Sequence, residues 1–435
     1  MPALRLRFAS CAAVRMDRCA PFLPRHPATM STTTAPIAPA ASPRLLSLDA
    51  YRGLIMVTLA FNGFGLAATA RNHLQADPTS GFWREVYHQF EHAEWVGCGY
   101  WDLIQPSFMF MVGVSMAYSY VNRQREGQSW VRMFGHACWR AVVLMLLGIF
   151  LTSNGSRATG WQFMNVLTQM GLGYAFLFLL WGRSLRTHAI TAAALLLGTW
   201  ALYATYSGAG LDPAKGAPAA GVPAAWAQEQ LTGVGTAWHK NANVGHAIDT
   251  WFLNLFPRRE PFVFNTGGYQ TINFIPSLAT MLFGLMVGEL LRSNRDARRK
   301  LLVLVVAGVV GLVAGLILSW LGVPLVKRIW TPSWALFSTG WCLLILATLY
   351  AIIDLHGWRA WSFPLVVVGM NSIAIYSMGM LLKPWTAKTL QTHLGENAFK
   401  LLGPANAPAV QATLVGLMFW LVCWWMYRRK IFLRI

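Results

Sequence analysis

Charged residues are scarce in this chain. Only 12% of its 435 residues are Asp, Glu, Lys or Arg, against about 25% in soluble domains, and 55% are hydrophobic. The six cysteines form no CxxC pair, and no HExxH motif occurs. We expect only Cys98 on the outer side of a membrane, without a cysteine partner, so neither a disulfide framework nor a metal site is indicated. The composition excludes an ordinary soluble domain.

The chain contains long runs of apolar residues. Ten windows of roughly twenty residues are each long enough to cross a hydrocarbon core of about 30 Å. They are residues 49–69, 101–121, 133–152, 163–181, 188–206, 270–291, 301–321, 334–353, 362–382 and 408–427. The sequence therefore predicts an all-α polytopic membrane protein with about ten transmembrane helices.

The formal net charge of +19 could suggest a nucleic acid partner, but the placement of the basic residues indicates otherwise. With the N-terminus in the cytoplasm, most of the 35 Lys and Arg residues fall in tails and short loops on the cytoplasmic side. Short cytoplasmic loops of membrane proteins are enriched in these two residues. The charge therefore predicts topology, with both termini cytoplasmic and no nucleic acid bound.

The N-terminal region differs in composition from the rest of the chain. Residues 1–29 are rich in Arg and lack the apolar core of a secretory signal. Met30 opens a low-complexity stretch, 30–44, which we expect to be a flexible cytoplasmic tail. We expect translation to start at Met30, so that 1–29 is a doubtful upstream extension. An organelle-targeting peptide is the alternative, because the segment is nearly free of acidic residues.

The remaining residues, 45–435, are predicted to form one ten-helix domain with two long outer loops. These loops are 70–100 and 207–269. Loops of this length are uncommon unless they have a role. Within the second loop, apolar residues at helical spacing predict a short interfacial helix over 244–255.

The first outer loop contains the histidine that carries the most chemical interest. His92 precedes Asp102 by ten residues, and the aspartate begins a strongly apolar run. A histidine near neutral pKa can take a proton from an amine or hydroxyl, or accept an acyl group itself. Asp102 could orient His92, or it could satisfy the free backbone N–H groups of a helix start. A histidine without a chemical role also fits this pattern.

Asn62 is a further candidate, in the outer half of the first apolar window. An amide in a lipid environment needs hydrogen-bond partners. Its side chain could donate a hydrogen bond to a developing oxyanion, as amides do in acyl transfer. It could equally bond to a neighbouring helix, because Gly63 and Gly65 suggest close packing at this point.

Arginines near the cytoplasmic ends of the predicted helices form a second group of candidates. Arg52 follows Asp49 by three residues, so a structural ion pair on one helix face is the simple interpretation. Arginine also suits bidentate phosphate contacts. Arg52, Arg140, Arg123 and Arg125 could therefore hold an anionic cofactor, although each also fits the general basic excess on that side.

Six blocks of sequence are informative when they are taken together and in order. They are RLLSLDAYRGLIMVTLAFNGFG, HAEWVGCGYWDLIQPSFMFMVGVSMAYS, NVLTQMGLGYAF, GGYQTINFIPSLATMLFGLMVGELL, KRIWTPSWALFSTGWCLLILATLYAIID and PLVVVGMNSIAIYSMG. In this order they resemble segments of the transmembrane acyltransferase family typified by heparan-alpha-glucosaminide N-acetyltransferase. The second block is similar to the family's HASW or HADW segment, and the fifth to its KxLWxxS segment. The match extends from about Arg44 to about Leu381.

The resemblance implies a function and assigns roles to three residues. The family moves an acetyl group from cytosolic acetyl-CoA to an amino sugar across the membrane. The resemblance implies that His92 is catalytic, that Asn62 is its partner and that Asp102 lies beside the site. It leaves open whether His92 deprotonates the acceptor or carries the acetyl group.

The excess of Arg over Lys bears on the source and the location of the protein, and through them on its acceptor. Arg outnumbers Lys, which fits a GC-rich bacterial gene. We therefore expect a bacterial inner membrane. The resemblance implies acetyl-CoA as donor and, in a bacterium, an amino sugar or envelope glycan as acceptor. We expect no metal, and a homodimer is a further expectation. A solute transporter or permease is the alternative class, although no internal repeat supports inverted halves. An inactive relative that serves as an interaction protein would explain VLTQ at 166–169, where the family shows VLQR.

Overall fold

The computed structural model describes residues 45–395 and 397–433, so the predicted extension 1–29 and tail 30–44 lie outside the described part. Sixteen α-helices follow one another there: α1 (Leu46–Ala60), α2 (Leu66–Ala76), α3 (Gly81–Phe90), α4 (Ile104–Arg125), α5 (Trp130–Thr152), α6 (Val166–Leu180), α7 (Leu185–Ala204), α8 (Ala224–Leu231), α9 (Val244–Phe252), α10 (Phe274–Arg292), α11 (Ala297–Trp320), α12 (Pro332–Leu349), α13 (Phe363–Gly369), α14 (Ser372–Leu381), α15 (Lys383–Leu394) and α16 (Ala407–Arg428). These residues contain no β-strand beyond one isolated bridge, so the all-α prediction is confirmed.

The helices include six that are long and apolar enough to cross a membrane. They are Trp130–Thr152, Leu185–Ala204, Thr271–Arg292, Ala297–Trp320, Pro332–Leu355 and Pro404–Arg428. Two bent helix pairs raise the number to eight if each pair is one span. The protein is therefore an integral membrane protein, while ten spans and the cytoplasmic placement of both ends stay predictions.

Two expected spans differ from the simple apolar window. Over 163–181, α6 has 15 residues, which at about 1.5 Å per residue is shorter than a 30 Å hydrocarbon core. Over 101–121, α4 has 22 residues but is not among the six, because polar residues such as Gln105 and Ser115 interrupt it. Both helices are extensively buried against others.

The first expected span, 49–69, is broken. Asn62, Gly63, Phe64 and Gly65 all have φ between 51° and 67°, which ends α1, and the two halves meet at 46°. The break lies against the start of α16, where a Cβ on Gly65 would come within 2.3 Å of the Pro408 carbonyl oxygen. Glycine is required there, both for the left-handed backbone and for the close approach.

The expected span 362–382 is also broken. Helices α13 and α14 meet at 68°. Asn371 lies at the bend, where its Nδ2 donates to the Ile431 carbonyl and its Oδ1 accepts from the Leu433 N–H. The sequence predicts one apolar span here; the polar side chain and the chain after α16 stabilise a turn within it.

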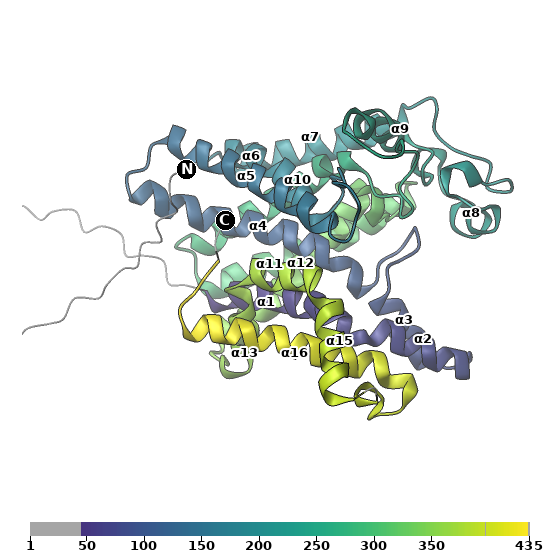
Figure 1. Cartoon of the computed structure of the whole chain (residues 1–435). Helices are drawn as coiled ribbons and strands as arrows, with labels where there is room; N and C mark the ends of the chain where they lie inside the picture. The colour runs from purple at the N-terminus through teal and green to yellow at the C-terminus, as the bar shows by residue number, and fades with distance from the viewer. Residues whose placement is uncertain (1–44, 396, 434–435) are drawn as a thin grey trace, which may run out of the picture. The chain divides into compact units, whose positions relative to one another are not determined.

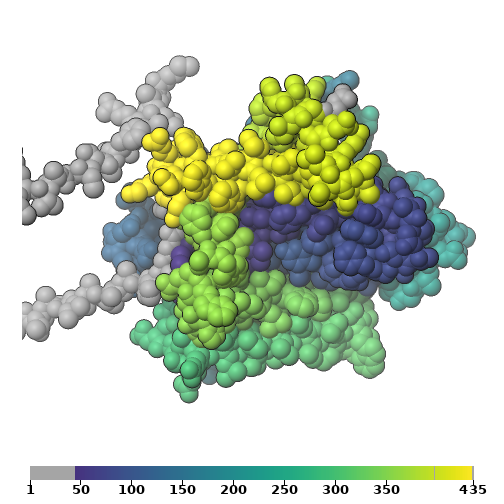
Figure 2. Space-filling view, turned by 90° about the horizontal axis from the view of Figure 1, so that it is seen from below, coloured from purple at the N-terminus to yellow at the C-terminus, as the bar shows by residue number. Residues whose placement is uncertain are grey.

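Closely packed helix pairs form the core of the described region. α4 lies against α10, α11 against α12, α5 against α6 and α1 against α13 (Figure 1). At the α4–α10 contact, a Cβ on Gly113 would lie 1.9 Å from the Met281 carbonyl oxygen. Small residues of this kind allow helix backbones to approach closely in membranes. On the face shown in Figure 2, α16 lies beside α2.

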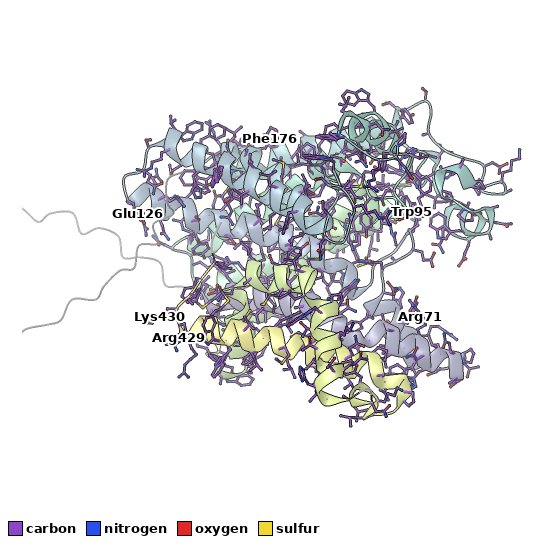
Figure 3. The ribbon with its side chains drawn as sticks, in the orientation of Figure 1. Arg71, Trp95, Glu126, Phe176, Arg429 and Lys430 are labelled. Carbon is purple, nitrogen blue, oxygen red and sulfur yellow. The ribbon has the colours of Figure 1, made fainter. Side chains whose placement is uncertain are left out.

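The two ends of the helical region carry different structures. Figure 3 shows Glu126, Arg429 and Lys430 at one end, and Arg71 and Trp95 at the other. The second end holds the expected outer loops. The first, 70–100, contains α3, and the second, 207–269, contains α8 and α9. The helix predicted over 244–255 is confirmed as α9 followed by a 3-10 turn over Leu253–Leu255.

Gly65→Ala is expected to lower thermal stability more than Gly127→Ala. Both glycines have left-handed φ angles, 67° and 76°, so both variants incur roughly 1–2 kcal/mol of backbone strain. Only at Gly65 does the added Cβ meet backbone, whereas nothing lies within 4 Å at Gly127. We expect a further loss of roughly 1–3 kcal/mol from overpacking. Thermal unfolding in detergent measures the melting temperature of both variants. An equal decrease in the two variants would contradict the packing of the break against α16.

Candidate active site

A buried carboxylate lies at the centre of a polar cluster at the end of the helical region that holds His92. Asp102 is 1% exposed and belongs to a 3-10 turn, Tyr100–Leu103, before α4. Its Oδ1 accepts from His92 Nδ1 at 2.7 Å and from Lys327 Nζ at 3.2 Å. Its Oδ2 accepts from the N–H groups of Ala93 and Gly99, at 3.0 and 3.1 Å. Because an ionised carboxylate has about four lone-pair sites, Asp102 is fully satisfied as an anion.

Asp102 therefore combines the two roles that the sequence left open. It bonds to His92, and it also satisfies backbone N–H groups beside a helix start. It does so from the third position of the 3-10 turn, by reaching back to Gly99, rather than as the residue that precedes α4. Glycine is needed at position 99, since a Cβ would lie 2.5 Å from the His88 carbonyl oxygen.

His92 lies in the segment between α3 and that 3-10 turn, with its side chain 34% exposed. The Asp102 carboxylate can only accept, so the bonded Nδ1 carries the proton and Nε2 holds the lone pair. No described residue hydrogen-bonds to Nε2. The pKa of His92 is lowered from its ordinary value, first because burial disfavours the imidazolium; the Asp102 hydrogen bond opposes this, and the Lys327 charge adds to it. The ring nitrogen of His92 that is not bonded to Asp102 is thus basic and without a protein partner among the described residues.

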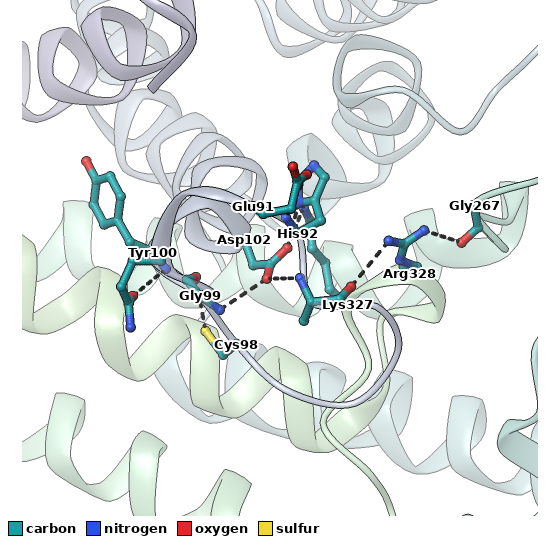
Figure 4. A network of polar contacts seen from close by, with 11 residues as sticks. Glu91, His92, Cys98, Gly99, Tyr100, Asp102, Gly267, Lys327 and Arg328 are labelled. Atoms are coloured by element: carbon teal, nitrogen blue, oxygen red, sulfur yellow. Dashed lines mark hydrogen bonds and ion pairs between the residues drawn. The ribbon is translucent and has the colours of Figure 1, made fainter. Parts of the chain in front are cut away.

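Lys327 is the third member of the cluster and its cation (Figure 4). Its side chain is 7% exposed, and Nζ donates to Asp102 at 3.2 Å. Nζ also lies 3.1 Å from His92 Nδ1; because the shorter contact makes Nδ1 the donor to Asp102, this nitrogen does not accept from Lys327, and the lysine acts on the ring through its charge. Composition and charge do not distinguish Lys327 from other basic residues of the outer side. The one signal in the sequence is its place at the start of the KRIW block, where the family pattern KxLW also begins with lysine.

The next residue joins the cluster to the second outer loop. Arg328 Nη1 donates to the Gly267 carbonyl at 2.9 Å, and Nη2 to the Ala93 carbonyl at 3.3 Å (Figure 4). On the same side, Trp226 Nε1 donates to Glu94 Oε2 at 2.6 Å. In addition, Trp95 Nε1 donates to the Trp238 carbonyl at 3.0 Å. The loop 207–269 is therefore joined to the His92 segment by several separate contacts.

Asn62 lies near the cluster without touching His92. A Cβ on its neighbour Gly63 would lie 3.2 Å from the Trp101 ring, and that ring is 6.3 Å from the His92 ring between centroids. The Asn62 Oδ1 accepts from Lys383 Nζ at 3.4 Å. The side-chain NH2 group has no acceptor among the described residues and stays available to donate.

Arg52 lies far along α1 from this cluster, toward the other end of the helices. Its guanidinium bonds to Asp49 at 3.2 Å and to Ser115 on α4 at 2.7 Å. The ion pair between Asp49 and Arg52 on one helix face, which is the simple interpretation of the sequence, is therefore present. Because half of α1 separates Arg52 from Asn62, any bound molecule that touched both would have to extend along the helix.

The other three arginines do not join Arg52. Arg123 Nη2 lies 2.8 Å from His136 Nε2, and Arg140 lies within electrostatic reach of the same histidine. The Arg140 guanidinium lies over the Tyr174 ring, 4.9 Å from its centroid. Arg125 is exposed at the end of α4. The structure therefore brings together Arg123 and Arg140 but not the full set.

Comparison with known proteins gives distant relatives. No protein-family model matches the chain. Heparan-alpha-glucosaminide N-acetyltransferase of Homo sapiens is 24% identical over 454 residues, which cover 94% of this chain and 62% of the human protein. The Mus musculus protein of the same name is 22% identical over 433 residues, covering 90% of this chain and 60% of its own length. The resemblance inferred from the six blocks is thus confirmed as a distant one, to proteins of which this chain spans less than two thirds.

Lys327→Met is expected to raise the pKa of His92. A lowered histidine pKa means that the neutral ring persists to lower pH and is lost as the pH falls through that pKa. Removing the Lys327 charge removes one cause of the lowering, so protonation of His92 should move to higher pH. NMR titration of labelled histidine, with His92 assigned through His92→Gln, measures the shift.

Two controls separate charge from structure in this titration. Lys327→Arg keeps the positive charge and should leave the His92 curve near its original position. Lys388→Met removes a charge from an exposed residue of α15 and should have no effect. A His92 curve that is the same in Lys327→Met as in the unmodified protein would show that Lys327 does not act on His92.

Proposed function

We propose that this protein is a transmembrane acetyltransferase. It moves an acetyl group from cytoplasmic acetyl-CoA to an amino sugar or envelope glycan on the outer side of a bacterial inner membrane. The observation that carries the proposal is the His92–Asp102 hydrogen bond of 2.7 Å, which leaves a partly exposed, neutral imidazole nitrogen. The distant similarity to N-acetyltransferases supports the same reaction class.

His92 has the central chemical role in this mechanism. Its Nε2 takes the proton from the acceptor amine or hydroxyl as that group attacks the thioester carbonyl; the C–S bond then breaks, and the departing CoA thiolate takes the proton back from the imidazolium. In the two-step form, Nε2 attacks the thioester first and CoA leaves as its C–S bond breaks. The acceptor then attacks the acetyl group on Nε2 and loses its proton, which frees the imidazole. In both, Asp102 holds the Nδ1–H tautomer and stabilises the cation that forms. Lys327 keeps Asp102 ionised.

Asn62 supplies stabilisation of the developing oxyanion. Lys383 binds its carbonyl oxygen, so the NH2 group is directed away from Lys383 and can donate to the thioester oxygen as negative charge builds there. The left-handed backbone at Asn62, with φ of 51°, holds the side chain outside the regular helix. Strained backbone of this kind is found at functional sites.

The donor would lie along the helices between the two ends. Arg52 offers a guanidinium for a phosphate at one end. Two hydroxyl pairs join α1 to α4 and to the 3-10 turn before it: Tyr51 OH lies 3.0 Å from Ser107 Oγ, and Thr58 Oγ1 lies 3.0 Å from Tyr100 OH. These hydroxyls provide hydrogen-bonding groups for the amides of an extended acyl-CoA arm. Arg123, Arg140 and Arg125 would add positive potential at the entrance.

His92→Ala is expected to abolish acetyl transfer. Purified protein in detergent, with acetyl-CoA and glucosamine, should release CoA only when both substrates are present. The variant should lose about 10²–10⁴-fold in rate, the usual contribution of a general base. His393→Ala, which changes an exposed histidine of α15, should be fully active. CoA release that needs His92 but not glucosamine would show that glucosamine is not the acceptor. The absence of turnover with any acceptor would overturn the proposed enzymatic activity.

Asn62→Ala is expected to lower kcat by about 10²–10³-fold, the cost of removing one oxyanion donor. The KM for acetyl-CoA should change little, because the donated hydrogen bond strengthens only as charge develops. Asn154→Ala, at an exposed loop position, provides the matched control in the same CoA-release assay. An unchanged kcat in Asn62→Ala would remove Asn62 from the mechanism.

A further inference from the structure

Two basic side chains beside the His92 segment have no carboxylate partner. Lys240 belongs to the second outer loop, and Arg328 to the turn that also carries Lys327. None of the ion pairs among the described residues includes either of them. Arg328 donates to two backbone carbonyls instead. A charge that is largely removed from water is unfavourable unless an opposite charge compensates it, so this pair of cations needs an explanation.

Lys240 is the less satisfied of the two cations. It is 8% exposed, and its ammonium makes no hydrogen bond within the described part of the chain. Nζ lies over the Trp226 ring, 4.5 Å from its centroid. This cation–π contact leaves the three N–H donors unused. Nζ keeps accessible surface, unlike Arg328 Nε, which is fully buried without a partner. An acceptor atom of a ligand can therefore reach the Lys240 ammonium.

The backbone on both sides of Lys240 is fixed. His239 Nε2 donates to the Val234 carbonyl at 2.9 Å. Asn241 Nδ2 donates to the carbonyls of Ala220 and Asn265, at 2.9 and 3.0 Å. Asn241 also has a left-handed φ of 51°, a strained conformation that is found at functional sites. The surrounding loop therefore holds Lys240 in place although its ammonium makes no hydrogen bond there.

The charges around Lys240 favour a bound anion. The pKa of Lys240 is lowered, first by burial and then by the Arg328 charge, while Glu94 opposes the shift. Glu94 is exposed, and its Oε2 accepts from Trp226 Nε1 at 2.6 Å. It acts on Lys240 from beyond ion-pair distance, so it compensates the ammonium only in part. An anion in contact with Nζ would stabilise the charged form that burial and Arg328 disfavour.

This cationic site is continuous with the His92 segment. Glu94 follows His92 by two residues, so their Cα atoms are at most about 7 Å apart. Trp226 joins Glu94 to the ring under Lys240, and Arg328 bonds to the Ala93 carbonyl. A molecule that presents an amine or hydroxyl to His92 therefore has Lys240 and Arg328 among its neighbours.

We propose that Lys240 binds an anionic group, a phosphate or a carboxylate, that the acceptor sugar carries. Arg328 adds positive potential at the same place. The identification of the bound molecule as the acceptor rests on the proposed acetyl transfer, whereas the anion site itself does not. The proposal narrows the acceptor from amino sugars in general to acidic ones, because a neutral sugar leaves the Lys240 charge uncompensated.

Equilibrium binding to purified protein in nanodiscs of zwitterionic lipid tests the proposal. The three probes are glucosamine 6-phosphate, glucosamine and inorganic phosphate. Glucosamine 6-phosphate should bind about tenfold more tightly than glucosamine, the factor expected of one hydrogen bond to a charged group. It should also bind more tightly than inorganic phosphate. Equal affinity for the two sugars would overturn the anion site, and equal affinity for the two phosphates would overturn its assignment to a sugar.

Two variants with opposite expected effects separate charge from structure. Lys240→Gln should weaken the binding of glucosamine 6-phosphate to the level of glucosamine. Glu94→Gln removes the nearby negative charge, keeps an acceptor for Trp226 and should strengthen that binding. Lys215→Gln, at an exposed lysine of the same loop, should leave it unchanged. An unchanged affinity in Lys240→Gln, or a decrease in both Lys240→Gln and Glu94→Gln, would overturn the proposal.

The CoA-release assay distinguishes this proposal from the proposed function. Binding of glucosamine 6-phosphate that depends on Lys240, without any acetyl transfer, would support the anion site and overturn the enzyme. Acetyl transfer with equal kcat/KM for glucosamine and glucosamine 6-phosphate would support the enzyme and overturn the acidic acceptor. A kcat/KM that is about tenfold higher for the phosphate, and only while Lys240 is present, is the result expected from both.

Discussion

Burial of the Asp102 carboxylate is the constraint on which the outer half of the structure depends. An ionised group that is 1% exposed is stable only when charge and hydrogen bonds compensate it. Its partners come from the turn at Gly99, from the His92 segment and from Lys327, which is 225 residues away in sequence. Satisfying this single anion fixes the geometry of three separate segments and sets the tautomer of His92.

Two of the apolar spans are interrupted, and other protein groups satisfy the backbone at both breaks. Both broken spans have an asparagine at the break, Asn62 and Asn371. Irregular backbone at membrane depth is tolerated only where other protein groups satisfy it. Lys383 contributes at the first break, because its Nζ donates to the Leu59 carbonyl in the last turn of α1. The second break is satisfied by the chain that follows α16.

The sequence predicts the fold class and the short helix over 244–255 well, because hydropathy and helical spacing are local properties. It also suggests the contact between His92 and Asp102, which the structure shows, because the two residues are ten positions apart on one loop and turn; their catalytic role stays a prediction. It cannot show Lys327 as their neighbour, because that contact depends on the packing of α12 beside α4. The broken spans are missed for a similar reason: an apolar composition does not reveal a left-handed residue such as Phe64. Whether α4 and α6 complete ten spans depends on a membrane position that hydropathy alone does not supply.

The most direct test of the account is acetyl transfer across a sealed membrane. The protein is reconstituted in one orientation in vesicles, with acetyl-CoA on the side of Arg429 and Lys430 and glucosamine on the side of His92. The account predicts acetylated sugar on the glucosamine side, at a rate that depends on His92, with free CoA remaining on the donor side. Movement of unmodified glucosamine without CoA release would contradict it and identify a permease.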